Sequence, residues 1–266
     1  MRSKTLPHLV FAWLAIIFLS TSNMIPVSAV GYTPGVKGGD YVKYSDIGAS
    51  WQSTVPGSQK PQSVTDFQNS NFFQIDISSV TGNNVTAKFQ ANFKNGTVTL
   101  RTFIGNVDSG QGNLTSGGVP LVAAGGLGAG DKVWNIPSSP TFNTTSSINY
   151  AGASREVNTW AFSFSSGGGY SSVTTVNIDK VTGVLLEYST NNNSTAPQGT
   201  TTQSERIKVT ETNLWSPTIL GLAPLYFYGI IALVIGVVIV AVVLLARTTR
   251  KPSVPTAQTA PPNTVG

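Results

Sequence analysis

The chain has 266 residues, of which 40% are hydrophobic and 10% are charged, with no cysteine and a formal net charge of +5. The lack of cysteine excludes disulfide bonds, cysteine nucleophiles and thiolate metal sites. The surplus of basic residues lies near the two chain ends, because 11 basic and 11 acidic side chains balance between residues 30 and 215. We therefore expect no nucleic acid among the partners of this protein.

The first segment has the three-part pattern of a secretory signal peptide. Two basic residues precede an apolar run over 9–19, and a polar stretch then ends in Val27-Ser28-Ala29. We predict that residues 1–29 are removed by cleavage between Ala29 and Val30. The alternative is an uncleaved anchor helix, but the apolar run is short for a membrane span.

Cleavage at this point would remove the only histidine and both methionines, which are His8, Met1 and Met24. Imidazole bases, Ser-His-Asp triads and the usual zinc sites would then be excluded. The remaining carboxylates suit Ca²⁺ or Mg²⁺, but they are spread singly and form no calcium-binding loop. We therefore predict no catalytic residue of these kinds, no bound metal and no cofactor.

Residues 30–215 are predicted to form an extracellular β domain. Apolar and polar side chains alternate over 73–78, 85–93 and 98–104, as in antiparallel strands with one buried face. The other candidate strands are 40–45, 118–124, 131–136, 147–151, 155–164, 171–179, 183–190 and 203–213. We predict an all-β antiparallel meander of ten or eleven strands, folded as a strongly curved sheet or a sandwich.

The alternation also predicts which side chains of 73–104 face the core. These are Phe73, Ile75, Ile77, Phe89, Ala91, Val98 and Leu100. Residues 51–70 break the pattern with two prolines, so we expect a surface excursion or a cap over one sheet face. The glycine-rich segments 123–130 and 165–169 lack a phosphate-loop motif and are predicted to be turns or bulges.

A short echo in the sequence places Gly-Asp before a candidate strand twice, at Gly39-Asp40 and at Gly130-Asp131. Duplication of a half-domain would explain the echo. We favour a shared turn, in which the glycine adopts a positive φ and the aspartate bonds its own backbone.

A long apolar segment without charge runs over 225–246. Its 22 residues reach ~33 Å at about 1.5 Å per residue, enough to cross a bilayer. Arg247, Arg250 and Lys251 follow as a stop-transfer cluster, so the positive-inside rule predicts a single-pass type I protein of the plasma membrane, N-terminus outside. A buried core helix is the alternative. We therefore predict a juxtamembrane linker at 216–224, a transmembrane helix in contact with lipid at 225–246 and a disordered cytoplasmic tail at 247–266.

Five motifs in chain order carry a resemblance. They are GDYVKY at 39–44, FKNGT at 93–97, GD at 130–131, YAGASREVN at 150–158 and DKVTGVLLE at 179–187. Together they resemble an uncharacterised group of archaeal secreted β-rich proteins, each with an N-terminal signal peptide and a C-terminal transmembrane anchor. The resemblance implies this topology and a β-rich fold, and it implies no activity.

Six N-x-S/T sequons lie in the segment predicted to be exported, at Asn84, Asn95, Asn113, Asn143, Asn192 and Asn193. The last two overlap, so at most one of them, taken as Asn193, is expected to carry a glycan. Asn84, Asn95 and the overlapping pair fall in predicted turns. We predict a glycoprotein, with Asn84 and Asn95 as the best candidates.

Three functions are compatible with these features. The first is a binding module or solute receptor, with an envelope protein or a glycan among its partners, and the second is a structural cell-envelope protein without a small-molecule ligand. The third and least favoured is a carboxylate-based hydrolase, with candidate acids Asp76, Glu156, Asp179, Glu187, Glu205 and Glu211. For each acid, an ordinary hydrogen-bonded polar group is the preferred interpretation. An apolar cavity in the folded domain would favour the first function.

Overall fold

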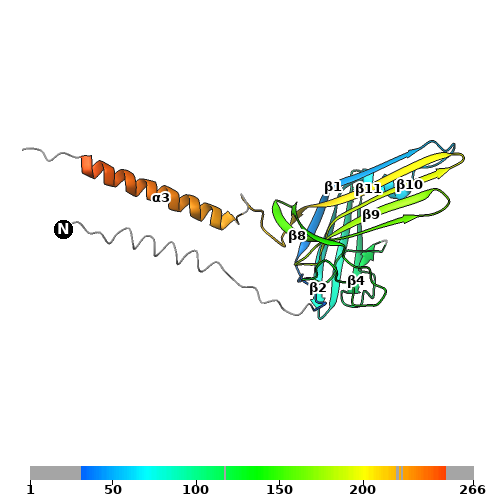
Figure 1. Cartoon of the computed structure of the whole chain (residues 1–266), viewed down its shortest axis with the longest axis horizontal. Helices are drawn as coiled ribbons and strands as arrows, with labels where there is room; N and C mark the ends of the chain where they lie inside the picture. Colours follow the sequence, from blue (N-terminus) through cyan, green and yellow to red (C-terminus); the bar gives the residue numbers. More distant parts are fainter. Residues whose placement is uncertain (1–30, 117, 220–221, 223, 250–266) are drawn as a thin grey trace, which may run out of the picture.

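The computed structural model describes residues 31–249 except 117, 220, 221 and 223, and its centre is one nine-stranded sheet (Figure 1). The strands are β1 (Tyr41–Ser53), β2 (Ser70–Thr81), β3 (Asn84–Phe93), β4 (Val98–Asn106), β7 (Thr144–Tyr150), β8 (Ala153–Ser165), β9 (Tyr170–Asp179), β10 (Leu185–Ala196) and β11 (Gly199–Thr212). The other elements are the short pair β5 (Thr115–Ser116) and β6 (Val119–Pro120), and the helices α2 (Gln62–Asn69) and α3 (Pro224–Thr249). The predicted signal peptide with its Ala29–Val30 cleavage site, and Arg250 and Lys251, lie outside the described residues.

The sheet is an antiparallel meander, as predicted. Its strand order is β4-β3-β2-β1-β11-β10-β9-β8-β7, so the first and last strands of the domain pair with each other in the interior of the sheet. The sheet is single and is neither closed nor strongly curled. The expectation of a strongly curved sheet or a sandwich was therefore wrong.

Irregular chain replaces the second sheet that a sandwich would need. Between β4 and β7, residues 107–143 form one two-residue strand pair, isolated bridges and turns. The predicted strands 118–124 and 131–136 belong to this segment, which we call the covering segment. Gly126 and Gly130 adopt positive φ there, as expected for turns, and such backbone cannot extend into a ladder.

The core lies between one face of the sheet and the covering segment. The sheet contributes apolar side chains such as Val42, Ile75 and Val176, and the covering segment contributes side chains such as Leu127 and Phe142, all at most 1% exposed. Most of the buried apolar side chains form one contiguous cluster across the two layers. We call this side of the sheet the core face and the opposite side the outer face.

β1 is the strand at which the sheet divides into two arms. It pairs with β2 only over Tyr41–Tyr44, whereas it pairs with β11 from Val42 to Ser53, with register shifts between Lys43 and Asp46. The long strands β1, β11, β10 and β9 thus extend away from β2 and β4 (Figure 1). α2 packs on β1 in this region and buries Val64 completely. This helix lies within residues 51–70, so that excursion does cap a sheet face.

The three strands of residues 73–104 are present, but the face predicted for β4 was wrong. Phe73, Ile75, Ile77 and Ala91 are buried as expected and Phe89 is half-buried, whereas Val98 and Leu100 are 47% and 68% exposed. The reason is the length of the turn. Four residues, 94–97, separate β3 from β4, and Asn92 pairs with Val98, so odd-numbered residues pair with odd ones and Ala87 lies opposite Phe103. Phe103 therefore faces the core, and Leu100 cannot.

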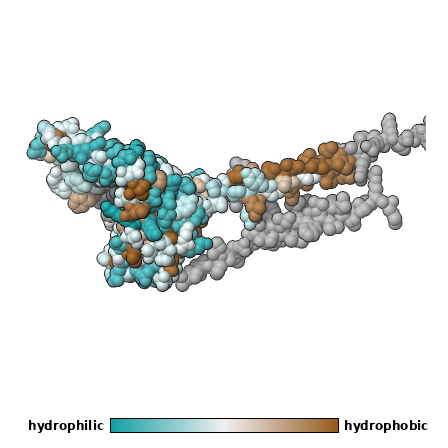
Figure 2. All heavy atoms as spheres, turned by 180° about the vertical axis from the view of Figure 1, so that it is seen from behind, coloured by the Kyte–Doolittle hydropathy of each residue, from teal (hydrophilic) through white to brown (hydrophobic). Residues whose placement is uncertain are grey.

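α3 is the one helix in the described part of the chain that is long and apolar enough to cross a membrane. Its segment Pro224–Leu244 has a mean hydropathy of 3.1 and is not buried against the domain. Figure 2 shows this helix as a mostly hydrophobic surface next to the largely hydrophilic domain. The helix predicted at 225–246 is present and continues to Thr249, which places Arg247 in its last turn.

Candidate functional site

An apolar pocket of about 280 Å³ opens on the core face, bounded by α2, the covering segment and the strands beneath them. Its lining side chains come from five elements and from the covering segment, and most of them are apolar. They are Phe67, Phe73, Phe89, Val119, Leu121, Leu185, Tyr188, Glu205 and Ile207.

Aromatic rings form one wall of this pocket. The ring of Phe67 on α2 meets Phe73 edge-on at 5.3 Å between centroids, and Phe73 lies tilted against Phe89 at 5.6 Å. Because Phe67 comes from the helix and the other two rings come from β2 and β3, the docking of α2 on the sheet completes the wall. Such rings offer a large apolar contact area with little rotamer freedom to lose.

The two polar side chains of the lining come from β10 and β11. Burial raises the pKa of Tyr188, and the nearby Glu205 carboxylate raises it further, so this phenol stays protonated and able to donate a hydrogen bond. Glu205 is 9% exposed, and its Oε1 accepts hydrogen bonds from Ser63 Oγ at 2.7 Å and Gln203 Nε2 at 2.8 Å. Small-molecule sites typically combine an apolar lining with a few such polar groups.

Asp179, another candidate acid, is hydrogen-bonded within the fold on both carboxylate oxygens. Its carboxylate is fully buried and receives both Nε and Nη2 of Arg155, at 2.8 and 2.9 Å. The backbone N–H and the hydroxyl of Thr182 donate to the same group at 2.8 and 2.7 Å. With these donors the carboxylate holds the β9–β10 turn against β8.

The remaining candidate acids are also bonded, at or near the outer face. Glu187 accepts from Arg206 at 3.0 Å and from Tyr150 at 2.8 Å, and Arg206 also binds Asp46 at 2.6 Å. Glu156 pairs with Lys180 and Asp76 accepts from Gln74. Glu211 accepts from Tyr41 and Lys43, and these two contacts lower the pKa of its exposed carboxyl. The six acids thus have separate partners, and the hydrolase hypothesis stays an untested prediction.

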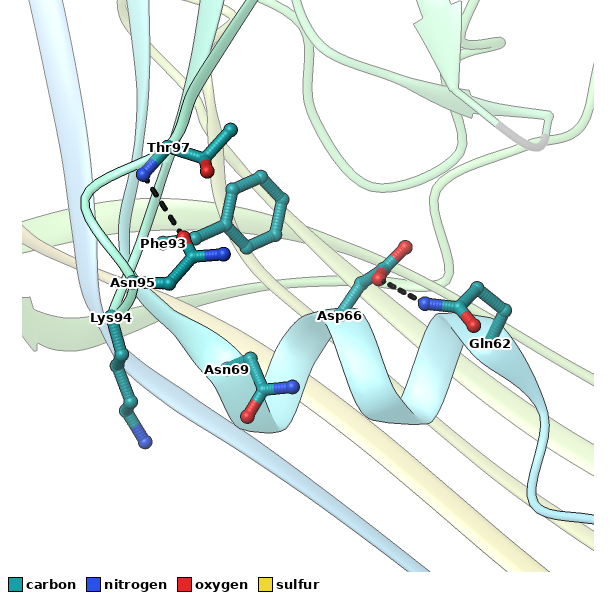
Figure 3. A pocket seen from close by; sticks show the side chains of 7 residues that line it. All are labelled: Gln62, Asp66, Asn69, Phe93, Lys94, Asn95 and Thr97. Carbon is teal, nitrogen blue, oxygen red and sulfur yellow. Dashed lines mark hydrogen bonds between the residues drawn. The ribbon is translucent and has the colours of Figure 1, made fainter.

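A second, more open depression of about 610 Å³ lies between α2 and the β3–β4 turn (Figure 3). Most of its lining side chains are polar, and several bond one another. Gln62 donates to Asp66 at 2.7 Å along the helix, and the Thr97 N–H donates to Asn95 Oδ1 at 2.9 Å across the turn. Asn95 is a candidate sequon, so a glycan attached there would lie at this depression.

The other sequons lie at exposed or half-exposed positions. Asn84 begins β3, whereas Asn113 and Asn143 lie in the covering segment, with side-chain oxygens that accept the backbone N–H of Ile104 and Ala161. Asn192 and Asn193 were expected in a turn, but they lie within β10, paired with β9 and β11. The run Asn191–Asn193 supplied a turn signal that pairing on both sides overrode. Glycosylation at all of these positions remains a prediction.

Sequence reasoning missed the pocket as a site, although it named Glu205 among the acids. The apolar parity of Phe73 and Phe89 was visible in the sequence. The sequence did not show that α2 would place Phe67 beside these rings and Ser63 beside Glu205. The hydrogen bond between Ser63 and Glu205 joins residues 142 positions apart.

No protein-family model matches the chain, and no curated protein matches it. The observed class is therefore a β-sheet domain with one C-terminal apolar helix and an open apolar pocket on the core face of the sheet. The resemblance of the sequence motifs to an archaeal group therefore does not assign the chain to a family.

Proposed function

We propose that this protein is a binding module or solute receptor held at a membrane surface by α3, and that the pocket beside α2 is its ligand site. The observation that carries the proposal is the apolar pocket itself. Rings, aliphatic side chains and two polar groups converge on a space of about 280 Å³ that communicates with solvent. A domain that served only as a spacer would gain stability from filling this space.

The remaining parts of the chain support the same role. α3 is long and apolar enough to anchor the domain to a lipid bilayer. The six sequons agree with a glycosylated protein on the cell surface. A tethered domain of this kind would capture an apolar solute, or an apolar group of an envelope component, close to the membrane.

A pair of matched substitutions tests the proposal. The full chain in lipid nanodiscs is titrated with the neutral aromatic alcohol 2-phenylethanol, with empty nanodiscs as the reference. We expect saturable binding by the parent chain and at least a tenfold loss in Val119→Phe, which adds bulk inside the pocket. Val98→Phe, at an exposed position of β4, should bind as the parent does.

Equal binding by both variants, or no saturable binding by the parent chain, would overturn this site assignment. Val119→Phe could also fail by disturbing the covering segment. Ile207→Phe, which adds bulk from the strand side of the pocket, therefore serves as the second pocket variant, and urea unfolding shows that each variant is folded.

A structural role in the cell envelope is the second candidate, favoured by the exposed edge of the sheet. β4 is an outermost strand whose end at Ile104–Asn106 bonds to residues 111–113 of the covering segment. Along the rest of its edge, the outward side chains Val98 and Leu100 are 47% and 68% exposed. Such an edge is a template for pairing with another strand. The occupant that fits is β4 of a second copy, since antiparallel pairing about Leu100 would join two identical apolar stripes. Concentration-dependent dimers that disappear in Leu100→Lys would support this role, and a monomer at all concentrations would reject it.

A further inference from the structure

The feature that points beyond an apolar ligand is the charge of Glu205. This residue lies on β11 between Gln203 and Ile207, with its side chain on the core face and 9% exposed. Placing a carboxylate in a largely apolar wall is costly unless donors or a cation compensate it. The protein compensates it in part, with the two neutral donors Ser63 and Gln203.

Both of these donors bond the same oxygen, Oε1. Among the described residues no side chain or backbone group donates to Oε2, and this atom is not sealed from solvent. The five ion pairs within the described residues use other acids, so no protein cation neutralises Glu205 there. The pocket wall therefore presents a carboxylate oxygen with free acceptor capacity.

We propose that the ligand of this pocket is an apolar amine, with its ammonium group on Oε2 of Glu205 and its aromatic or aliphatic body against the phenylalanine wall. This inference rests on the proposed function and specifies its ligand class. A charge-assisted hydrogen bond from the ammonium would supply the cation that the protein does not provide.

The test compares three small probes that share a phenyl ring and differ in the charge of the head group. They are 2-phenylethylamine, 2-phenylethanol and 3-phenylpropanoate, titrated by calorimetry at pH 7 into the full chain in neutral-lipid nanodiscs, with empty nanodiscs subtracted. We expect the amine to bind at least tenfold more tightly than the alcohol, and the carboxylate to bind most weakly.

Two isosteric variants locate the effect. Glu205→Gln keeps the size of the side chain and should lower amine affinity to the level of the alcohol, while alcohol affinity stays unchanged. Glu211→Gln removes an equal charge from an exposed position of the same strand and should leave the preference for the amine intact.

The outcomes separate the two levels of the proposal. If the alcohol binds but the amine is not preferred, or if Glu205→Gln keeps the preference, the ligand class is wrong and the pocket remains a binding site. If none of the three probes binds the parent chain, the binding function fails together with the ligand class.

Discussion

At the residue scale, the buried acids Asp179 and Glu205 differ in their hydrogen-bond partners, because Asp179 pairs with a cation and Glu205 accepts from neutral donors. Asp179 is closed by Arg155 and Thr182, so its charge and its acceptor atoms are satisfied within the protein. Glu205 lines the pocket with neutral donors on one oxygen, and its second oxygen receives no donor from the residues that the structure describes. The first arrangement stabilises a fold, whereas the second leaves capacity for a ligand.

The Asp179–Arg155 pair makes a prediction for stability. Asp179→Asn leaves the partly buried Arg155 without its anion, and breaking a buried pair in this way costs about 3–5 kcal/mol. We expect a clearly lower urea midpoint for the full chain in micelles, followed by tryptophan fluorescence. Glu156→Gln is the control, because its pair with Lys180 is exposed and should contribute about 1 kcal/mol or less. A similar midpoint for the two variants would contradict the assignment.

The buried tyrosines predict alkaline unfolding. Burial raises the pKa of Tyr44 and of Tyr150, and for Tyr150 the Glu187 carboxylate adds to the effect. Because the pKa is raised in the folded state, the stabilisation is fully present below the ordinary phenol pKa of about 10 and is lost as the pH rises above it. We expect these phenols to ionise only when the protein unfolds, with ionisation followed by the absorbance of phenolate at 295 nm. Tyr44→Phe should show a shallower loss of stability above pH ~10.

Ionisation of all tyrosines in a chain that keeps its native circular dichroism would refute that expectation. Tyr44→Phe also loses the hydrogen bond from the hydroxyl to the Leu185 carbonyl, 2.7 Å long. Its stability at neutral pH should therefore fall by about 1 kcal/mol.

At the element scale, β4 shows how a turn decides which face a strand buries. The four-residue turn before β4 sets the pairing register that exposes Leu100. Leu100→Ala should therefore change the free energy of unfolding by about 0.5 kcal/mol or less. Leu186→Ala, the same change at a fully buried position, should cost about 2–5 kcal/mol. Urea unfolding of both variants measures the difference, and equal costs would mean that β4 has the opposite face inward.

The two Gly-Asp turns have the same local geometry, as expected for a shared turn. Gly39 and Gly130 both have φ of +90°. Asp40 accepts the N–H of Lys37, and Asp131 accepts that of Gly128, each at 2.7 Å and three residues back. A common turn thus accounts for the echo in the sequence without a duplication.

Close approach of two segments makes Gly183 a sensitive position. A Cβ at Gly183 would meet the carbonyl oxygen of Ala123 at 2.1 Å, where the covering segment contacts the β9–β10 turn. Gly126 has a similar φ and open space around it. Gly126→Ala should therefore cost only the backbone strain of about 1–2 kcal/mol, and Gly183→Ala should cost distinctly more. Thermal unfolding of the two variants side by side measures this; equal costs would show that the segments move apart easily.

At the scale of the whole molecule, the arrangement is a sheet domain followed by one apolar helix (Figure 1). The pairing of β1 with β11 brings both ends of the sheet domain together. The linker to α3 therefore leaves the domain beside β1, its first strand. The domain that contains the apolar pocket is thus connected to α3 at a single point.

Membrane orientation is the prediction at this scale. With the N-terminus outside, protease added to intact cells should remove the domain and leave a short membrane fragment that carries a C-terminal epitope tag. The physical reason is the basic cluster Arg247, Arg250 and Lys251, which the positive-inside rule predicts to stay on the cytoplasmic side. Permeabilised cells, in which the tag is also lost, are the control. Protection of the domain in intact cells would reverse the orientation.

The sequence alone determined the features that depend on neighbouring residues and on composition. Alternation over 73–78 and 85–93 predicted strands with the correct inward side chains, because strand periodicity is local. The uncharged run at 225–246 predicted the long apolar helix for the same reason. Composition excluded cysteine chemistry without any structure.

Only the tertiary structure decided the features that depend on contacts between distant residues. The face of Leu100 depended on pairing between strands, and the single sheet depended on how the irregular covering segment packs. The pocket required Ser63 on α2 to meet Glu205 on β11 across 142 positions. Such contacts form because many weak interactions act together over the whole domain, and no local pattern of side chains encodes them singly.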